Sequence, residues 1–154
     1  MDLSDLIEVE AIVPALKANS KKQVLQLLSE KAAAVTGLSE REIFDTILQR
    51  ERLGSTGVGN GIAIPHGKLP GIKEIKGVFA RLEHPVEFDA LDDLPVDLVF
   101  LLLAPEGAGA DHLKALSRIA RVLRDSDTTD KIRGTKDATA IHTFLSQAPA
   151  SNAA

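Results

Sequence analysis

The chain has 154 residues, which is typical of one domain, and its 18 Lys or Arg against 22 Asp or Glu give a formal net charge of −4. The absence of Cys excludes disulfides, iron–sulfur clusters, thiolate metal sites and Cys nucleophiles, and fits a reducing compartment. No apolar run approaches the ~20 residues of a membrane helix, and an acidic chain without Trp or Tyr lacks a nucleic-acid footprint, so we expect a cytoplasmic protein.

Two helices are predicted in the first third of the chain. Ser20 followed by Gln23, and Ser39 followed by Glu42, have the spacing of a capping box, in which the side chains at a helix start bond to backbone N–H groups. Apolar residues recur at helical spacing after both starts, and Gly37 is a stop for the first helix. The short joint between them predicts adjacent helices whose apolar faces share one core.

Three strands are predicted in the middle of the chain. Six of the 11 glycines fall in the segment 54–71, a density that no helix tolerates, and the apolar run 62–64 within it predicts a short strand between two loops. Residues 77–82 predict a second strand, and the continuous apolar run 97–103 predicts a buried central one. A short extended piece before the first helix is expected to end at Pro14.

Two more helices are predicted near the end of the chain, over 111–123 and about 137–146. The apolar face of the first is expected to comprise Leu113, Leu116, Ile119, Ala120 and Leu123. The resulting order of elements predicts a single α/β or α+β three-layer domain over residues 1–147, with a mixed central β-sheet flanked by helices on both faces. The small residues 148–154 are expected to form a disordered tail.

The segment 57–68, with the sequence GVGNGIAIPHGK, is the densest candidate for chemistry. It is not a known phosphate loop, because Ile62 stands where a Walker A loop and a dinucleotide fingerprint both need Gly. Pro65 lacks an N–H, so strand pairing is expected to end there, which places the imidazole of His66 at the rim of the sheet. A hydrogen bond to one ring nitrogen would leave the other as a nucleophile; the pattern alone equally allows an ordinary turn histidine.

The same residues resemble the active-site signature of type-2 enzyme IIA domains of the phosphoenolpyruvate-dependent phosphotransferase system. That signature asks for an acidic or amide residue, a six-residue gap, then apolar, small, two free positions, apolar, Ala, apolar, Pro, His and a small residue. Glu51, the gap 52–57 and the run Val58-Gly59-Asn60-Gly61-Ile62-Ala63-Ile64-Pro65-His66-Gly67 meet every position. The resemblance extends over about residues 3–147, and the residues flanking the signature resemble the nitrogen-related branch of the family.

The resemblance implies that His66 accepts a phosphoryl group, through Nε2, from a phosphohistidine on a small carrier protein similar to HPr. Arg50 matches the active-site arginine of the family and His112 its second histidine. A guanidinium fork and a histidine at a helix start both suit phosphate oxygens, whereas without the resemblance they would be a solvated charge and an ordinary helix-start residue. Three small polar loop residues are further candidates for phosphate contacts: Ser55, Thr56 and Asn60.

The resemblance also bears on cofactors and partners. It implies transfer between imidazoles without a metal or other cofactor, and the four histidines show no metal-ligand spacing. His84 is expected in a turn, and His142 is expected on the last helix without a ligand partner. In the nitrogen-related branch the phosphorylation state acts as a signal to partners such as potassium-transport proteins or sensor kinases. The alternatives are a sugar-specific IIA component that passes phosphate to a IIB subunit, and a binding module that has lost the chemistry.

Overall fold

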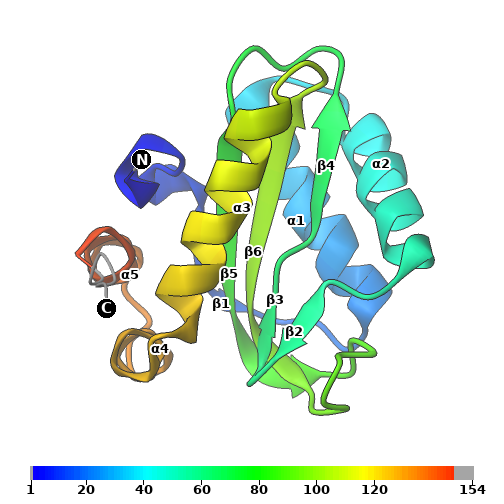
Figure 1. Ribbon diagram of the computed structural model, residues 1–154. Helices are drawn as coiled ribbons and strands as arrows, with labels where there is room; N and C mark the ends of the chain where they lie inside the picture. The colour runs from blue at the N-terminus through cyan, green and yellow to red at the C-terminus, as the bar shows by residue number, and fades with distance from the viewer. Residues whose placement is uncertain (1, 148–154) are drawn as a thin grey trace.

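The computed structural model of the protein describes residues 2–147, and a mixed sheet forms their centre (Figure 1). The strands are β1 (Ile12–Leu16), β2 (Gly57–Gly59), β3 (Ile62–Ala63), β4 (His66–Leu69), β5 (Lys76–Val86) and β6 (Val96–Pro105). Their order is β1-β5-β6-β3-β2, and β4 also pairs with β6. The central pair β5–β6 is antiparallel, whereas β1 joins β5, and β3 and β4 join β6, in parallel. The predicted mixed sheet is thereby confirmed.

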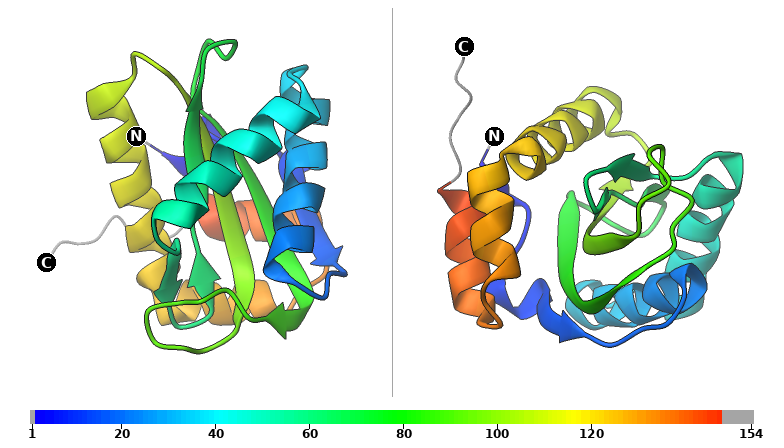
Figure 2. Two further views of the ribbon diagram at one scale, coloured as in Figure 1. Left: turned by 90° about the vertical axis from the view of Figure 1, so that its right-hand side faces the viewer. Right: turned by 90° about the horizontal axis from the view of Figure 1, so that it is seen from below.

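Helices cover both faces of this sheet, as the three-layer prediction required (Figure 2). The helices are α1 (Lys21–Thr36), α2 (Glu40–Leu53), α3 (Gly109–Arg124), α4 (Ser126–Arg133) and α5 (Ala138–Ser146), and two short 3₁₀ turns, Leu3–Asp5 and Val9–Ala11, precede β1. The pair α1 and α2 packs on one side, against β5 and β4, and α3 to α5 lie on the other. None of the helices within residues 2–147 has the length and apolar character needed to cross a membrane.

The two predicted helix starts at the beginning of the chain are confirmed. The hydroxyl of Ser20 accepts a hydrogen bond from the N–H of Gln23 at 3.1 Å, and that of Ser39 accepts one from Glu42 at 3.3 Å. In a capping box the Gln23 side chain would accept the N–H of Ser20. Here its oxygen accepts the N–H of the preceding residue, Asn19, at 2.7 Å. Each start therefore satisfies a backbone donor that the helix itself leaves unpaired.

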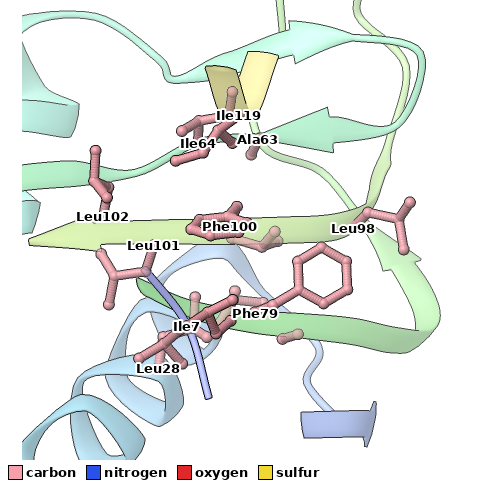
Figure 3. Packing of buried hydrophobic residues seen from close by; sticks show 14 of the residues in the cluster. Ile7, Leu28, Ala63, Ile64, Phe79, Leu98, Phe100, Leu101, Leu102 and Ile119 are labelled. Carbon is pink, nitrogen blue, oxygen red and sulfur yellow. The ribbon is translucent and has the colours of Figure 1, made fainter. Parts of the chain in front are cut away.

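The core is built around β6, whose residues 98–104 are all fully buried. The rings of Phe79 and Phe100, on neighbouring strands, meet edge to face with centroids 6.0 Å apart (Figure 3). Leu28 from α1 and Ile119 from α3 pack against opposite faces of the sheet. Full burial of each such side chain contributes about 1.5–3 kcal/mol to the stability of the fold. The sheet is therefore stable enough to hold the residues at its edge in position.

Strand pairing does not end at Pro65, contrary to the prediction. The Pro65 carbonyl still accepts the N–H of Leu102 at 2.9 Å, and pairing resumes at once in β4, where His66 lies opposite Leu102. A proline removes only the donor of its own residue, and β6 is long enough to pair with β3 and β4 one after the other. His66 thus lies at the junction of two short strands that share one neighbour.

Three other elements differ from the prediction. Pro14 lies inside β1 rather than ending it, because β1 is an edge strand and its outer side needs no ladder donor. β2 was expected as loop, since two of its three residues are glycines. α4 was not predicted at all; it begins at Asp125, whose carboxylate accepts the N–H and the hydroxyl of Thr128 at 3.1 and 2.6 Å.

The predicted apolar face of α3 is confirmed except at Leu113, which is 69% exposed. Ile119 and Leu123 are buried, Leu116 and Ala120 pack against the core, and the face also includes His112, Ala115 and Val122. His84 lies within β5 and is exposed, not in a turn. The predicted tail, 148–154, lies outside the described residues.

Candidate active site

His66 is held by its own backbone neighbourhood. The Nδ1 atom of its ring lies 2.8 Å from the carbonyl oxygen of Ile64. Because a carbonyl oxygen only accepts, Nδ1 must carry the proton and donate it. In the neutral ring the lone pair is then on Nε2, the atom through which the family resemblance implies phosphoryl transfer.

His112 faces His66 from the first turn of α3. The two rings meet edge to face, with centroids 5.6 Å apart and an interplanar angle of 74°. Only 6% of His112 is exposed, and within residues 2–147 its buried Nε2 has no hydrogen-bond partner. An unpaired buried polar atom is costly, so this nitrogen is suited to bond a group that enters between the rings.

Three elements converge on an open cavity of about 450 Å³ beside the two rings. It is lined by Thr46, Gln49, Arg50 and Leu53 of α2, by His66, Gly67 and Lys68 of β4, and by His112 of α3. The guanidinium of Arg50 also donates from Nη1 to the Gly54 carbonyl at 3.0 Å, at the C-terminal end of its own helix. Two cations, Arg50 and Lys68, therefore border the cavity, which suits a dianionic phosphoryl group.

Both rings are less basic than free histidine. Burial is the main cause that lowers the pKa of His66, and the charge of Arg50 lowers it further, whereas the bond to Ile64 and the charge of Glu51 oppose the shift. Burial also lowers the pKa of His112, followed by the charges of His66 and Lys68. Both shifts favour the neutral form of the ring, in which Nε2 of His66 keeps its lone pair.

A buried carboxylate lies behind the cavity. Glu51 follows Arg50 on α2, and its side chain is only 2% exposed. Its oxygens pair with the Lys21 ammonium at 2.9 Å and accept the N–H of Thr56 at 3.2 Å and the hydroxyl of the same residue. Sequence reasoning used Glu51 only as a signature position and did not assign it these contacts.

The three further candidates for phosphate contacts have other partners. The Ser55 hydroxyl donates to the Phe88 carbonyl at 2.6 Å, and Thr56 is bonded to Glu51. Asn60 occupies the β2–β3 turn with a φ of 57°, and its N–H donates to Asp92 at 2.9 Å. None of the three lines the cavity beside His66.

Four cavity residues escaped the sequence analysis, although three carried a readable signal. Thr46, Gln49 and Leu53 share one face of α2 with Arg50, at spacings of three and four residues. Once Arg50 was a candidate, helical periodicity alone would have found them. Lys68 could have been placed at the cavity only if the strand β4 had been predicted, and Pro65 had argued against a strand there. The remaining histidines, His84 and His142, do not line this cavity.

The comparisons with known proteins agree with this fold and site. The family model described as "Phosphoenolpyruvate-dependent sugar phosphotransferase system, EIIA 2" matches residues 5–148. The chain therefore belongs to the type-2 enzyme IIA family of the phosphotransferase system.

Relatives place the chain near one branch of that family. It is 61% identical over 153 residues to a nitrogen regulatory protein of Bradyrhizobium diazoefficiens, covering 99% of this chain and all of that one. It is 43% identical over 134 residues to a nitrogen regulatory protein of Escherichia coli, covering 86% and 82% of the two chains. These relatives confirm the predicted resemblance to the nitrogen-related branch.

Solved structures share the fold. The crystal structure of nitrogen regulatory protein IIA-Ntr from Neisseria meningitidis matches with a TM-score of 0.88 and 34% identity, covering 93% of this chain and 98% of that one. The mannitol-specific IIA protein of E. coli shares the fold, with a TM-score of 0.75 at 22% identity over 90% of this chain and 97% of that one.

Proposed function

We propose that the protein is a phosphocarrier of the nitrogen-related phosphotransferase system, with His66 as the residue that is phosphorylated. The donor is a phosphohistidine on a small carrier protein similar to HPr. The Nε2 lone pair of His66 attacks phosphorus, a new N–P bond forms, and the N–P bond to the imidazole of the carrier breaks, returning its electron pair to that imidazole. The observation that carries the proposal is the Nδ1–H bond to Ile64, because it leaves Nε2 unprotonated on a ring that lines the cavity.

The surrounding side chains fit distinct parts of this step. Arg50 and Lys68 offset the charge that spreads over the phosphoryl oxygens, and Nε2 of His112 bonds one of them. Phosphoryl transfer depends mainly on positioning and electrostatic stabilisation, and no metal or other cofactor is part of the proposed step. The cysteine-free chain suits a cytoplasmic setting for the reaction.

Two exposed leucines favour docking of a protein donor at this cavity. Leu53, which lines it, is 85% exposed, and Leu113, next to His112, is 69% exposed. Exposed apolar side chains around a polar cavity are typical of a protein interaction surface. We assign them to contact with the carrier, so that binding and chemistry share one face.

The proposed output is regulatory. A phosphoryl group adds about −1.5 to −2 charges at pH 7, which offsets the two positive charges of Arg50 and Lys68 beside His66. Partners such as potassium-transport proteins or sensor kinases would then discriminate between the two forms of the protein. The alternative is a sugar-specific IIA component that passes its phosphoryl group to a IIB subunit; the names of the most similar relatives above favour the regulatory role.

Intact mass spectrometry tests the proposal. The protein is incubated with phosphoenolpyruvate, enzyme I and the HPr-like carrier, and compared with His66→Ala and with the control His84→Ala, which removes an exposed histidine of β5. We expect one acid-labile phosphoryl group on the parent and on the control, and none on His66→Ala. A parent that stays unmodified with every cognate carrier would refute the function, and rapid discharge onto a IIB subunit would favour the sugar-specific alternative.

A further inference from the structure

A continuous series of contacts runs from the first residue of α1 to the reactive ring. The Lys21 ammonium pairs with the Glu51 carboxylate at 2.9 Å, and that carboxylate accepts the N–H and the hydroxyl of Thr56. The Thr56 carbonyl accepts the N–H of Ile64 at 3.0 Å. The Ile64 carbonyl in turn accepts Nδ1–H of His66 at 2.8 Å. The first three contacts join different segments of the chain, and the last links two residues that are two apart in the sequence.

The carboxylate at the start of this series has little freedom to move. A charge with a side-chain exposure of 2% is stable only when it is paired and hydrogen-bonded. Glu51 pairs with Lys21 of α1 and accepts two hydrogen bonds from Thr56. All three contacts require the carboxylate to stay in its present position. Thr56 is itself 5% exposed, so its bonds to Glu51 have little competition from water.

The last contact in the series decides which ring nitrogen of His66 carries the proton. If the Ile64 carbonyl moved away, Nδ1–H would lose its acceptor and the tautomer with the proton on Nε2 would become populated. That tautomer has no lone pair on the atom proposed to attack phosphorus. Ile64 is held on one side by its N–H bond to the Thr56 carbonyl, while its neighbours pair with β6, and Thr56 is held by Glu51.

We propose that Glu51 is a positioning residue, which through Thr56 and Ile64 holds His66 in the Nδ1–H tautomer with Nε2 toward the cavity. The inference rests on the proposed function for its consequence in phosphoryl transfer. Arg50 and Glu51 then serve the same site from adjacent positions of α2: Arg50 borders the cavity, and the buried carboxylate of Glu51 bonds Lys21 and Thr56. Partners that orient metal-bound histidines commonly change metal affinity or activity by about 10–100-fold when they are replaced, and we expect an effect of that size here.

Two replacements of Glu51 test the proposal by different chemistry. Glu51→Leu removes every acceptor and keeps a similar volume, whereas Glu51→Gln keeps an oxygen that can accept from Thr56. The ring nitrogens of His66 are followed by ¹⁵N NMR, which separates the two tautomers, and the rate of phosphoryl acceptance is followed by mass. We expect Glu51→Leu to populate the Nε2–H tautomer and to lower the rate about tenfold or more, and Glu51→Gln to stay within about threefold of the parent.

A second pair of variants covers the case in which Glu51→Leu does not fold. Thr56→Val removes the hydroxyl donor and keeps the shape of the side chain, and Thr56→Ser keeps the donor. We expect Thr56→Val to shift the tautomer in the same direction and Thr56→Ser to match the parent. Folded Glu51→Leu or Thr56→Val with the parental tautomer would overturn the proposal. The NMR measurement needs no phosphoryl donor, so its outcome is separate from the failure of the parent to be phosphorylated.

Discussion

The ring of His112 meets that of His66 edge to face, with centroids 5.6 Å apart, from an element that is 46 residues further along the chain. One ring presents an unprotonated Nε2 and the other a buried Nε2 without a partner among residues 2–147. A phosphoryl group bound between them would use both atoms at once. The pair is therefore the centre of the site, and its properties can be tested one ring at a time.

Removal of His66 should make His112 more basic. Burial is the largest cause that lowers the pKa of His112, and the charge of His66 is the next. In His66→Ala we expect the pKa of His112 to rise but to stay below its ordinary value, because the burial remains. NMR titration of the His112 ring in the parent and in the variant measures this directly. An unchanged pKa would show that the two rings are electrostatically independent.

Replacement of His112 should slow phosphoryl acceptance without preventing it. Loss of one hydrogen-bond donor to a developing oxyanion commonly costs about 10²–10³ in rate. We expect His112→Ala to fall in that range, and His112→Gln to retain part of the rate because its amide can still donate. Single-turnover transfer from the phosphorylated carrier gives the rate. His142→Ala, on α5, is the matched control and should transfer at the parental rate.

Arg50 and Arg52 offer a matched comparison of charge. Both lie in the last turn of α2, but only Arg50 lines the cavity, and Arg52 is exposed. We expect Arg50→Ala to lower the transfer rate about 10²-fold and Arg52→Ala to leave it nearly unchanged, although both remove one positive charge. Because Arg50 lowers the pKa of His66, that pKa should also rise in Arg50→Ala. Equal effects of the two variants would indicate a general charge effect on docking.

These residues show how far the sequence predicts the structure. Capping signals and apolar periodicity act over a few residues, so they predicted the helices α1 and α2 and the central strand β6. The sheet edge depends on distant partners: β4 exists because β6 extends past β3, and a local pattern with Pro65 and Gly67 cannot report that. The short helix α4 has a polar sequence, SDTTDKIR, and depends on one cap and one buried isoleucine, Ile132.

The candidate site was predicted unevenly for a similar reason. The signature located His66, and matching positions located Arg50 and His112, all of which the structure brings to one cavity. The burial of His112 could have been read from the α3 residues 112, 115, 119 and 122, had Leu113 not suggested a neighbouring face. The contacts of Glu51 could not be predicted from the sequence, because they require α1, α2 and the segment at Thr56 to meet in space.

The pKa shifts also predict how stability depends on pH. The folded-state pKa of His66 and of His112 lies below the value of about 6.5 for an unfolded chain. The unfolded chain therefore binds more protons in acid, and the stabilisation is fully present above pH ~6.5 and is lost as pH falls through the folded-state pKa values. We expect the free energy of unfolding, from urea titrations at several pH values, to fall less steeply below pH ~6.5 in His66→Ala/His112→Ala than in the parent. Parallel curves would contradict the shifts.

Gly67 tests whether the distance between α2 and β4 matters for transfer. A Cβ at this position would lie 2.7 Å from Cγ2 of Thr46, and the next contact, with Ile47, would be an ordinary 3.7 Å. Gly67→Ala should therefore push α2 away from β4, at a cost of about 1–3 kcal/mol in the free energy of unfolding. The same shift would carry Arg50 away from His66, since both border the cavity between these elements.

The double variant Gly67→Ala/Thr46→Ser provides the control, because serine lacks the methyl group that the new Cβ would meet. Chemical denaturation and single-turnover transfer are measured on the single and the double variant. We expect the double variant to recover most of the stability and of the transfer rate that Gly67→Ala loses. Recovery of stability without recovery of rate would mean that an alanine beside His66 obstructs the phosphoryl group or the carrier directly, and that the spacing of the two elements is not what limits transfer.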